Sequence, residues 1–187
     1  MKFLDRVLRD WRIREGSCYI RPDDKVLDFG CFDGYLFKTL EDKPIQPSIG
    51  IDPLLKETIY NGKHKLISGK FPESLSENET FDCIVMLAVL EHIPRVQQKK
   101  FSQEFFKHLN PNGRIIITVP SPFVDHILTV LTKLGLIEGM SVDEHYGFET
   151  KEVFTLFEAQ NFRLLKHKKF QLGLNNLFVF EKLKEVN

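Results

Sequence analysis

The stretch VLDFGCFDGYLF, from Val26 to Phe37, constrains the fold of this chain more than any other run of its sequence. Apolar residues flank Asp28 in a short β-favouring segment, and Gly30 and Gly34 bracket the bend that follows. Beyond the bend, apolar residues recur at helical spacing. The stretch therefore predicts a strand, a glycine-bearing turn and a helix, which together bring backbone N–H groups close to a bound ligand.

The rest of the chain alternates between strand-like and helix-like segments, without a long linker, a low-complexity tract or an internal repeat. This alternation predicts an α/β fold in which helices cover both faces of a mostly parallel sheet. At 187 residues the chain fits one domain, residues 1–187. We expect seven strands, the last two of which form a C-terminal antiparallel hairpin. The expected strands are residues 25–30, 47–52, 65–68, 81–87, 113–119, 163–171 and 176–182, and a helix is expected over residues 151–160 before the hairpin.

Two further segments are amphipathic. Residues 1–20 predict an N-terminal helix that either closes over a substrate or packs on the sheet edge. Its apolar stripe is formed by Phe3, Leu4, Val7, Leu8 and Trp11. Residues 121–149 predict an insertion that covers a substrate, and core packing, a homodimer face or peripheral contact with a membrane are the alternatives for its apolar face. Polar residues interrupt this segment too often for a transmembrane helix.

Composition narrows the class of protein. Lys plus Arg and Asp plus Glu both number 26, so the chain has no overall electrostatic footprint for nucleic acid. The cysteines, Cys18, Cys31 and Cys83, are odd in number and far apart, which disfavours a disulfide framework or a zinc site and favours a reducing cytoplasm. No cluster of carboxylates has the spacing of metal ligands, so we expect no metal.

The acidic residues around the glycine turn indicate which ligand it accepts. Asp52 ends the next expected strand about 20 residues downstream, where a carboxylate can bind both ribose hydroxyls of an adenosine. The GxGxxG spacing of dinucleotide enzymes is absent, and Asp33 would repel a pyrophosphate. Asp28 and Asp33 suit a ligand with positive charge, such as the ammonium and sulfonium of S-adenosylmethionine. Capping of the following helix is the alternative role for Asp33, and an NAD-dependent oxidoreductase is the less favoured class.

Four motifs in order resemble those of class I S-adenosylmethionine-dependent methyltransferases, in the small-molecule group related to ubiquinone-biosynthesis enzymes. They are VLDFGCFDG, IGIDP, FDCIVMLAVLEHI and LNPNGRIIITVPSP, and the resemblance extends from Val26 to Lys182. It implies a Rossmann-like, seven-stranded sheet and S-adenosylmethionine as the cofactor.

The resemblance also implies which residues bind that cofactor. Gly30, Cys31 and Gly34 would face its methionine part, Asp52 its ribose, and Leu87 with Ala88 would lie beneath the sulfonium. Lys70 stands where the family usually has an acidic residue for the adenine amine, and Phe71 either stacks on the base or fills the core. The expected cofactor-binding residues are Asp28, Gly30, Cys31, Phe32, Asp33, Gly34, Asp52, Pro53, Lys70, Phe71, Leu87 and Ala88.

Phe32 is the main departure from the family pattern, which has glycine at that position. Either its side chain points away from the cofactor, or the chain is a catalytically silent cofactor-binding protein. A large gain in cofactor affinity when Phe32 is replaced by glycine would support the second interpretation.

The methyl acceptor is expected to be a small, lipid-like or sugar-containing molecule. Methyl transfer needs alignment and desolvation more than a conspicuous catalytic residue. By resemblance, His145 is the candidate base, with a structural role as its alternative, and Glu144, Tyr146 and His92 are weaker candidates. Nucleic-acid methylation is disfavoured, because neither an Asn/Asp-Pro-Pro-aromatic turn nor a Pro-Cys nucleophile is present.

Overall fold

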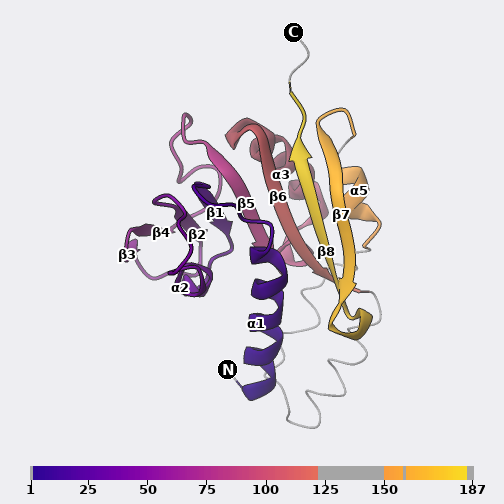
Figure 1. Cartoon of the computed structure of the whole chain (residues 1–187). Helices are drawn as coiled ribbons and strands as arrows, with labels where there is room; N and C mark the ends of the chain where they lie inside the picture. The colour runs from indigo at the N-terminus through magenta and orange to yellow at the C-terminus, as the bar shows by residue number, and fades with distance from the viewer. Residues whose placement is uncertain (1, 122–149, 158, 185–187) are drawn as a thin grey trace.

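The computed structural model of the protein describes residues 2–121, 150–157 and 159–184. At its centre lies an eight-stranded sheet with the order β3-β4-β2-β1-β5-β6-β8-β7 (Figure 1). The strands are β1 (Val26–Phe29), β2 (Ile49–Asp52), β3 (Ile59–Asn61), β4 (His64–Ser68), β5 (Phe81–Leu87), β6 (Leu109–Pro120), β7 (Phe162–Phe170) and β8 (Asn175–Lys182).

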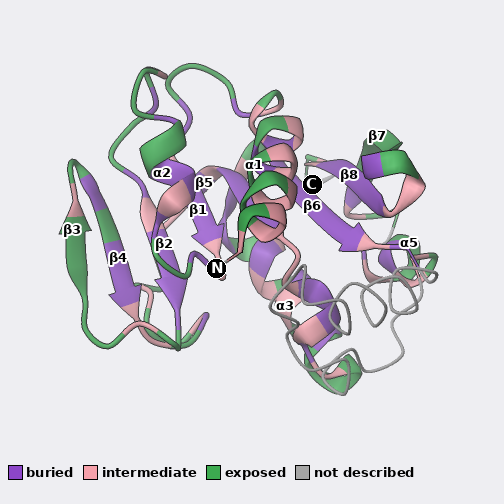
Figure 2. Cartoon of the chain, turned by 90° about the horizontal axis from the view of Figure 1, so that it is seen from below, coloured by how far each residue is buried: buried purple, intermediate pink, exposed green. Residues whose placement is uncertain are grey.

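Five neighbouring strands, β4, β2, β1, β5 and β6, run parallel, and β8 pairs antiparallel with both β6 and β7. The mostly parallel sheet and its C-terminal antiparallel hairpin are therefore confirmed. The expectation of seven strands is wrong by one, because β3 adds a short antiparallel partner to β4 at the far edge. All three residues of β3 remain at least partly exposed (Figure 2), so the strand lacks the alternating burial that would mark it in the sequence.

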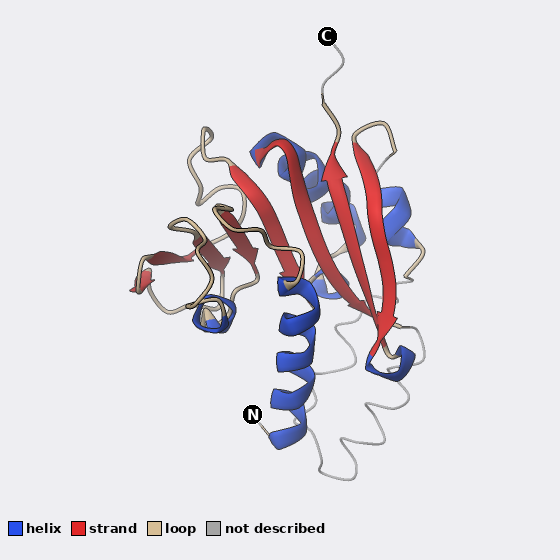
Figure 3. Ribbon diagram, in the orientation of Figure 1, coloured by secondary structure: helices blue, strands red, loops and turns tan. Residues whose placement is uncertain are grey.

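Helices lie on both faces of the sheet (Figure 3). One apolar cluster includes residues of α1 and α2, and the cluster on the other face includes residues of α3 and α5. Alternate residues of β6 serve the two clusters: Ile115 and Ile117 join the α3 cluster, and Ile116 joins the α1 cluster. The helices are α1 (Phe3–Ser17), α2 (Tyr35–Thr39), α3 (Arg95–His108) and α5 (Glu152–Leu156), with the 3₁₀ turns η1 (Leu90–His92) and η3 (Gln171–Gly173).

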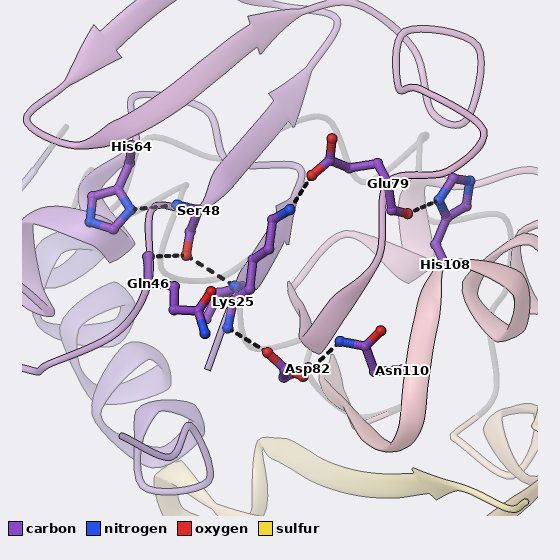
Figure 4. Close-up of polar contacts among 9 residues, drawn as sticks. Lys25, Gln46, Ser48, His64, Glu79, Asp82, His108 and Asn110 are labelled. Carbon is purple, nitrogen blue, oxygen red and sulfur yellow. Dashed lines mark hydrogen bonds and ion pairs between the residues drawn. The ribbon is translucent and has the colours of Figure 1, made fainter. Parts of the chain in front are cut away.

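Polar side chains tie the strands together at the amino end of the parallel sheet (Figure 4). Asp82 accepts hydrogen bonds from the Lys25 backbone N–H at 2.9 Å and from Asn110 Nδ2 at 2.8 Å. The Lys25 ammonium pairs with Glu79, whose backbone carbonyl lies 2.6 Å from His108 Nδ1. These contacts hold the amino-terminal ends of β1, β5 and β6 together. The opposite, carboxyl edge of the sheet is left for ligand-binding loops.

The boundaries of most elements lie within three residues of those expected, and two boundaries differ by four. The helix expected over 151–160 ends at Leu156, and β6 starts at Leu109 rather than Gly113. The N-terminal helix forms as predicted, but its apolar stripe is only partly covered, since Phe3 is 74% and Val7 40% exposed. The segment 121–149 lies outside the described residues except for Ser121, and no helix among the described residues is long and apolar enough to span a membrane.

Candidate functional site

The glycine turn lies at the carboxyl edge of the sheet, which is the lower edge in Figure 1. The Gly30 N–H donates to the Ile51 carbonyl at 2.9 Å, which anchors the turn to β2. Gly30 and Gly34 have φ angles of 79° and 70°. A Cβ at Gly30 would lie 2.5 Å from Val89 Cγ2, and a Cβ at Gly34 would lie 2.5 Å from Leu66 Cδ1. Both the backbone conformation and the space therefore require glycine at these two positions.

Phe32 occupies the middle of the turn with φ at 47°, and it is 64% exposed. The exposed side chain is not part of the interior of the turn. What Phe32 contributes is its backbone N–H, which donates to Asp52 Oδ2 at 2.9 Å. The turn tolerates a side chain at this position because the side chain is directed to the outside.

Asp52 is the buried carboxylate that joins the two loops of the site. Its Oδ2 accepts from the Phe32 N–H, and its Oδ1 accepts from the Leu54 N–H at 2.8 Å. An ionised carboxylate offers about four lone-pair sites, so each oxygen retains capacity after one bond. The side chain is held rigidly and can still accept hydrogen bonds from a ligand.

Asp28 is buried in β1, where it pairs with Gly50, two residues before Asp52 on the neighbouring strand β2. Burial, followed by the charges of Asp52 and Asp33, raises its pKa to about 8. Among the described residues, none donates a hydrogen bond to its carboxyl group. A buried carboxyl group without a donor is costly to ionise, and a cationic ligand beside it would relieve that cost.

Asp33 lies on the outside of the turn. Its Oδ1 accepts from the Tyr35 N–H at 3.2 Å at the start of α2, although the N-cap position of this helix is held by Gly34. Arg9 of α1 approaches the other oxygen at 3.9 Å, and its guanidinium lies 3.5 Å from the centre of the Tyr35 ring. The N-terminal helix thus reaches the glycine turn.

The remaining expected residues fall into three environments. Cys31 is buried beside Gly50, and burial raises the pKa of its thiol. Ala88 has φ at 57°, and its N–H donates to the carbonyl and hydroxyl oxygens of Thr118 at 3.0 and 3.1 Å. Leu87 ends β5 and contacts α1, since a Cβ at Gly16 would lie 3.2 Å from Leu87 Cδ2.

Phe71 belongs to the core. Only 4% of it is exposed, and its ring centre lies 5.5 Å from that of Phe29 and 5.0 Å from that of Phe105. This burial agrees with the core-filling alternative rather than with stacking on a base. Lys70 and Pro53 are exposed at the same edge of the sheet, where the Lys70 backbone N–H donates to Ser74 Oγ at 3.1 Å.

Sequence reasoning missed Arg12, which lies on the inner side of α1. Burial lowers the pKa of its guanidinium, and Glu91 of η1 is the largest opposing charge. Arg12 precedes Gly16 by about one helical turn, so it shares the face of α1 that packs on Leu87. The four-residue spacing between Arg12 and Gly16 indicates that they share one face of the helix. The sequence does not show what that face packs against. Val89, which fills the space beneath Gly30, was missed for the same reason.

The candidate bases are not brought into the described site. His145, Glu144 and Tyr146 lie outside the described residues, and His92 is a partly buried residue of η1. Within the part of the chain that the structure describes, no group of three or more His, Cys, Asp or Glu residues could hold a metal ion.

Comparisons with known proteins agree with this geometry. A family model described as a methyltransferase domain matches residues 2–167. The ubiquinone biosynthesis O-methyltransferase of Rickettsia typhi is 26% identical over 164 residues, which cover 81% of this chain and 65% of that protein. The chain therefore spans slightly less than two thirds of the length of this curated relative.

Two solved structures have a similar fold at low identity. One is a complex between the Haloferax volcanii Trm112 methyltransferase activator and a methyltransferase, with 12% identity, a TM-score of 0.72, and coverage of 98% of this chain and 94% of that one. The other is the Burkholderia thailandensis 1,6-didemethyltoxoflavin-N1-methyltransferase with bound 1,6-didemethyltoxoflavin and S-adenosylhomocysteine. Its identity is 15%, its TM-score 0.66, and the coverage 92% of this chain and 79% of that one.

Proposed function

This chain belongs to the S-adenosylmethionine-dependent methyltransferase family, and from that premise we propose that it transfers the cofactor's methyl group to a small-molecule acceptor. The single observation that carries the proposal is the pairing of the glycine turn with Asp52. The turn leaves no room for side chains at Gly30 and Gly34, and Asp52 is fixed by two backbone donors while retaining acceptor capacity.

The residues of the turn fit the cofactor's charges and hydroxyl groups. Asp52 would accept hydrogen bonds from the ribose hydroxyls, and the turn from Gly30 to Gly34 would border the methionine part. Asp28, which has no donor among the described residues, would lie close enough to favour a positively charged ammonium. When bound, S-adenosylmethionine supplies an electrophilic methyl group on a sulfonium.

Arg12 is the residue that we add to this set. Its guanidinium is partly buried, and no hydrogen bond to it is found among the described residues. A desolvated guanidinium is a strong donor for a carboxylate, which the methionine part of the cofactor carries. α1 places Arg12 near Glu91 and the end of β5, beside the turn that Arg9 contacts. We assign Arg12 the role of holding that carboxylate.

The chain's contribution to the transfer step is alignment and exclusion of water. Ala88 is fixed at the end of β5 by the two oxygens of Thr118, so the floor of the site is rigid. α1 covers the same edge through Gly16 and Leu87. A rigid, covered site favours displacement at carbon by proximity and desolvation. For a hydroxyl acceptor, His145 remains the proposed base, by resemblance alone.

Two observations support a small-molecule acceptor over nucleic acid. The curated relative is an O-methyltransferase of ubiquinone biosynthesis, and one structural neighbour holds 1,6-didemethyltoxoflavin.

Transfer of a labelled methyl group tests the proposal. The protein is incubated with methyl-labelled S-adenosylmethionine and with separate pools of phenols, amines, lipid extracts and total RNA. We expect label in a small-molecule or lipid pool, at a level that falls at least about tenfold in Asp52→Asn. Label in RNA alone would contradict the acceptor class, and cofactor binding without transfer to any pool would favour the silent alternative.

A further inference from the structure

The edge strand β7 carries a concentration of positive charge that the proposed reaction does not use. β7 is the last strand of the sheet, and residues 163–169 are all exposed. The exposed run reads RLLKHKK, although the whole chain has equal numbers of acidic and basic residues. Two leucines in it, Leu164 and Leu165, are 40% and 41% exposed.

Part of this charge is already paired. Arg163 contacts Glu181 of β8 at 2.5 Å, and Lys168 contacts Glu15 of α1 at 2.7 Å. Lys166 and Lys169 pair with no carboxylate among the described residues. Because successive side chains of a strand point to opposite faces, Lys166 and Lys169 offer one free cation on each face of the sheet.

The backbone of the same segment is regular. From Lys166 to Phe170, every residue pairs with one residue of β8, starting at Val179 and ending at Asn175. The register shift in this strand pair lies before this stretch, between Leu164 and Lys166. No strand of the described chain lies beyond β7, so the outward-facing backbone N–H and C=O groups of this stretch pair with no further strand among the described residues.

The charges determine which strand can pair there. Lysines on an edge disfavour pairing with a second copy of the same edge, because like charges would lie opposite one another. They favour an extended segment whose acidic side chains lie opposite Lys166 and Lys169. The exposed leucines beside this stretch give such a segment an apolar anchor.

We propose that residues 166–170 of β7 form a docking edge for an acidic, extended segment of a partner protein, which would add a ninth strand to the sheet. The main-chain hydrogen bonds provide the attraction, and the lysines select for an acidic partner. This surface is remote from the glycine turn, since β8, β6 and β5 lie between β7 and β1 (Figure 3). Docking at this edge would not require methyl transfer.

Binding of a fluorescein-labelled peptide of valine and threonine to the full chain tests the proposal. Two glutamates three positions apart in this peptide can lie opposite Lys166 and Lys169 on the two faces of the sheet. Fluorescence anisotropy is compared with that of a peptide of equal charge in which two valines are replaced by proline, which cannot donate to a ladder. We expect the proline peptide to bind at least about tenfold more weakly, and the amides of 166–170 to exchange more slowly only with the first peptide.

Variants identify the surface. The double variant Lys166→Glu and Lys169→Glu should weaken binding of the proline-free peptide about tenfold, whereas Lys99→Glu, an exposed lysine of α3, should leave it unchanged. Unchanged circular dichroism verifies that the double variant folds. Equal binding of both peptides, absence of binding, or tighter binding of polyuridine RNA or phosphatidylglycerol vesicles would overturn the proposal.

Discussion

Phe32 carries a side chain at a position of the glycine turn where the backbone is left-handed. Gly30, Phe32 and Gly34 all have positive φ, and only Phe32 carries a side chain in that conformation. A left-handed residue other than glycine costs roughly 1–2 kcal/mol. The rest of the turn holds Phe32 there, because its N–H is bound by Asp52.

We therefore expect Phe32→Gly to stabilise the fold by about 1 kcal/mol or less, since relief of strain is partly offset by a more flexible unfolded chain. Cofactor affinity should change less than about threefold, because the exposed side chain is not part of the turn's interior. Urea unfolding and calorimetry measure the two effects. A large gain in affinity would instead indicate a cofactor site that Phe32 has degraded.

Gly30→Ala tests the close approach to Val89. The added Cβ is both strained by positive φ and placed 2.5 Å from Val89 Cγ2, so we expect a loss of stability of about 2–5 kcal/mol. In a Val89→Ala background the steric part should disappear, and the remaining effect of Gly30→Ala should be about 1–2 kcal/mol. Equal losses in the two backgrounds, measured by urea unfolding, would show that Val89 is not the obstacle.

Asp28 should make the ligand-free protein less stable as the pH rises. Its pKa in the folded protein is about 8, above the ordinary value of 3.8, so the folded state binds this proton more tightly than the unfolded state. The contribution is complete below about pH 4 and is lost as the pH rises to about 8, by up to about 1.4 kcal/mol for each pH unit.

Asp28→Asn removes this dependence. The stability of the variant relative to the natural protein should increase steadily from pH 5 to pH 8 and then level off. Urea unfolding at intervals of pH measures the difference. A constant difference across this range would mean that Asp28 ionises at an ordinary pH.

At the scale of elements, α1 connects the sheet to the cofactor site. Its C-terminal half packs on the sheet, where Ile13 and Gly16 are buried, and its N-terminal half reaches Asp33 through Arg9. Gln171 Nε2 also donates to the Leu8 carbonyl at 2.8 Å. The two halves of the helix are held by different interactions, and a bound ligand should affect them differently.

We expect S-adenosylhomocysteine to slow hydrogen exchange in the residues up to Arg12 by about tenfold and to leave the last turn of α1 nearly unchanged. Arg12→Gln should abolish this protection, whereas Arg14→Gln, which alters an exposed arginine of the same helix, should retain it. Protection that is uniform along α1, or that persists in Arg12→Gln, would contradict the role given to Arg12.

The elements differ in how well the sequence predicts them. β5 is predicted to the residue, because its nearly continuous apolar run suits a strand buried on both faces. β6 begins earlier than predicted, because the turn signals of residues 110–113 are accommodated inside the strand, with Asn112 at φ 61° and a register shift opposite Phe81. The three residues of β3 are too few for any periodicity to appear.

At the scale of the whole molecule, the site residues that lie close in sequence are predictable and those joined through space are not. The positions of Gly30, Gly34 and Asp52 at one edge follow from the strand order of an α/β sheet. The proximity of Arg12 to Glu91 depends on how α1 crosses the edge, which no local pattern records. The burial of Phe71 depends likewise on rings from α3, including Phe105.

Calorimetric titration with S-adenosylmethionine and S-adenosylhomocysteine tests the central claim, that Asp52 and the glycine turn form the cofactor site. We predict binding of both to the natural protein, and an affinity at least about tenfold lower in Asp52→Ala and Asp52→Asn, because each lost hydrogen bond to a charged group contributes about 1.5–3 kcal/mol. Glu57→Ala, an exposed acidic residue of the same loop, is the control and should bind normally. No binding to the natural protein, unchanged affinity in both Asp52 variants, or Asp52-dependent binding of NAD in place of S-adenosylmethionine would contradict the claim.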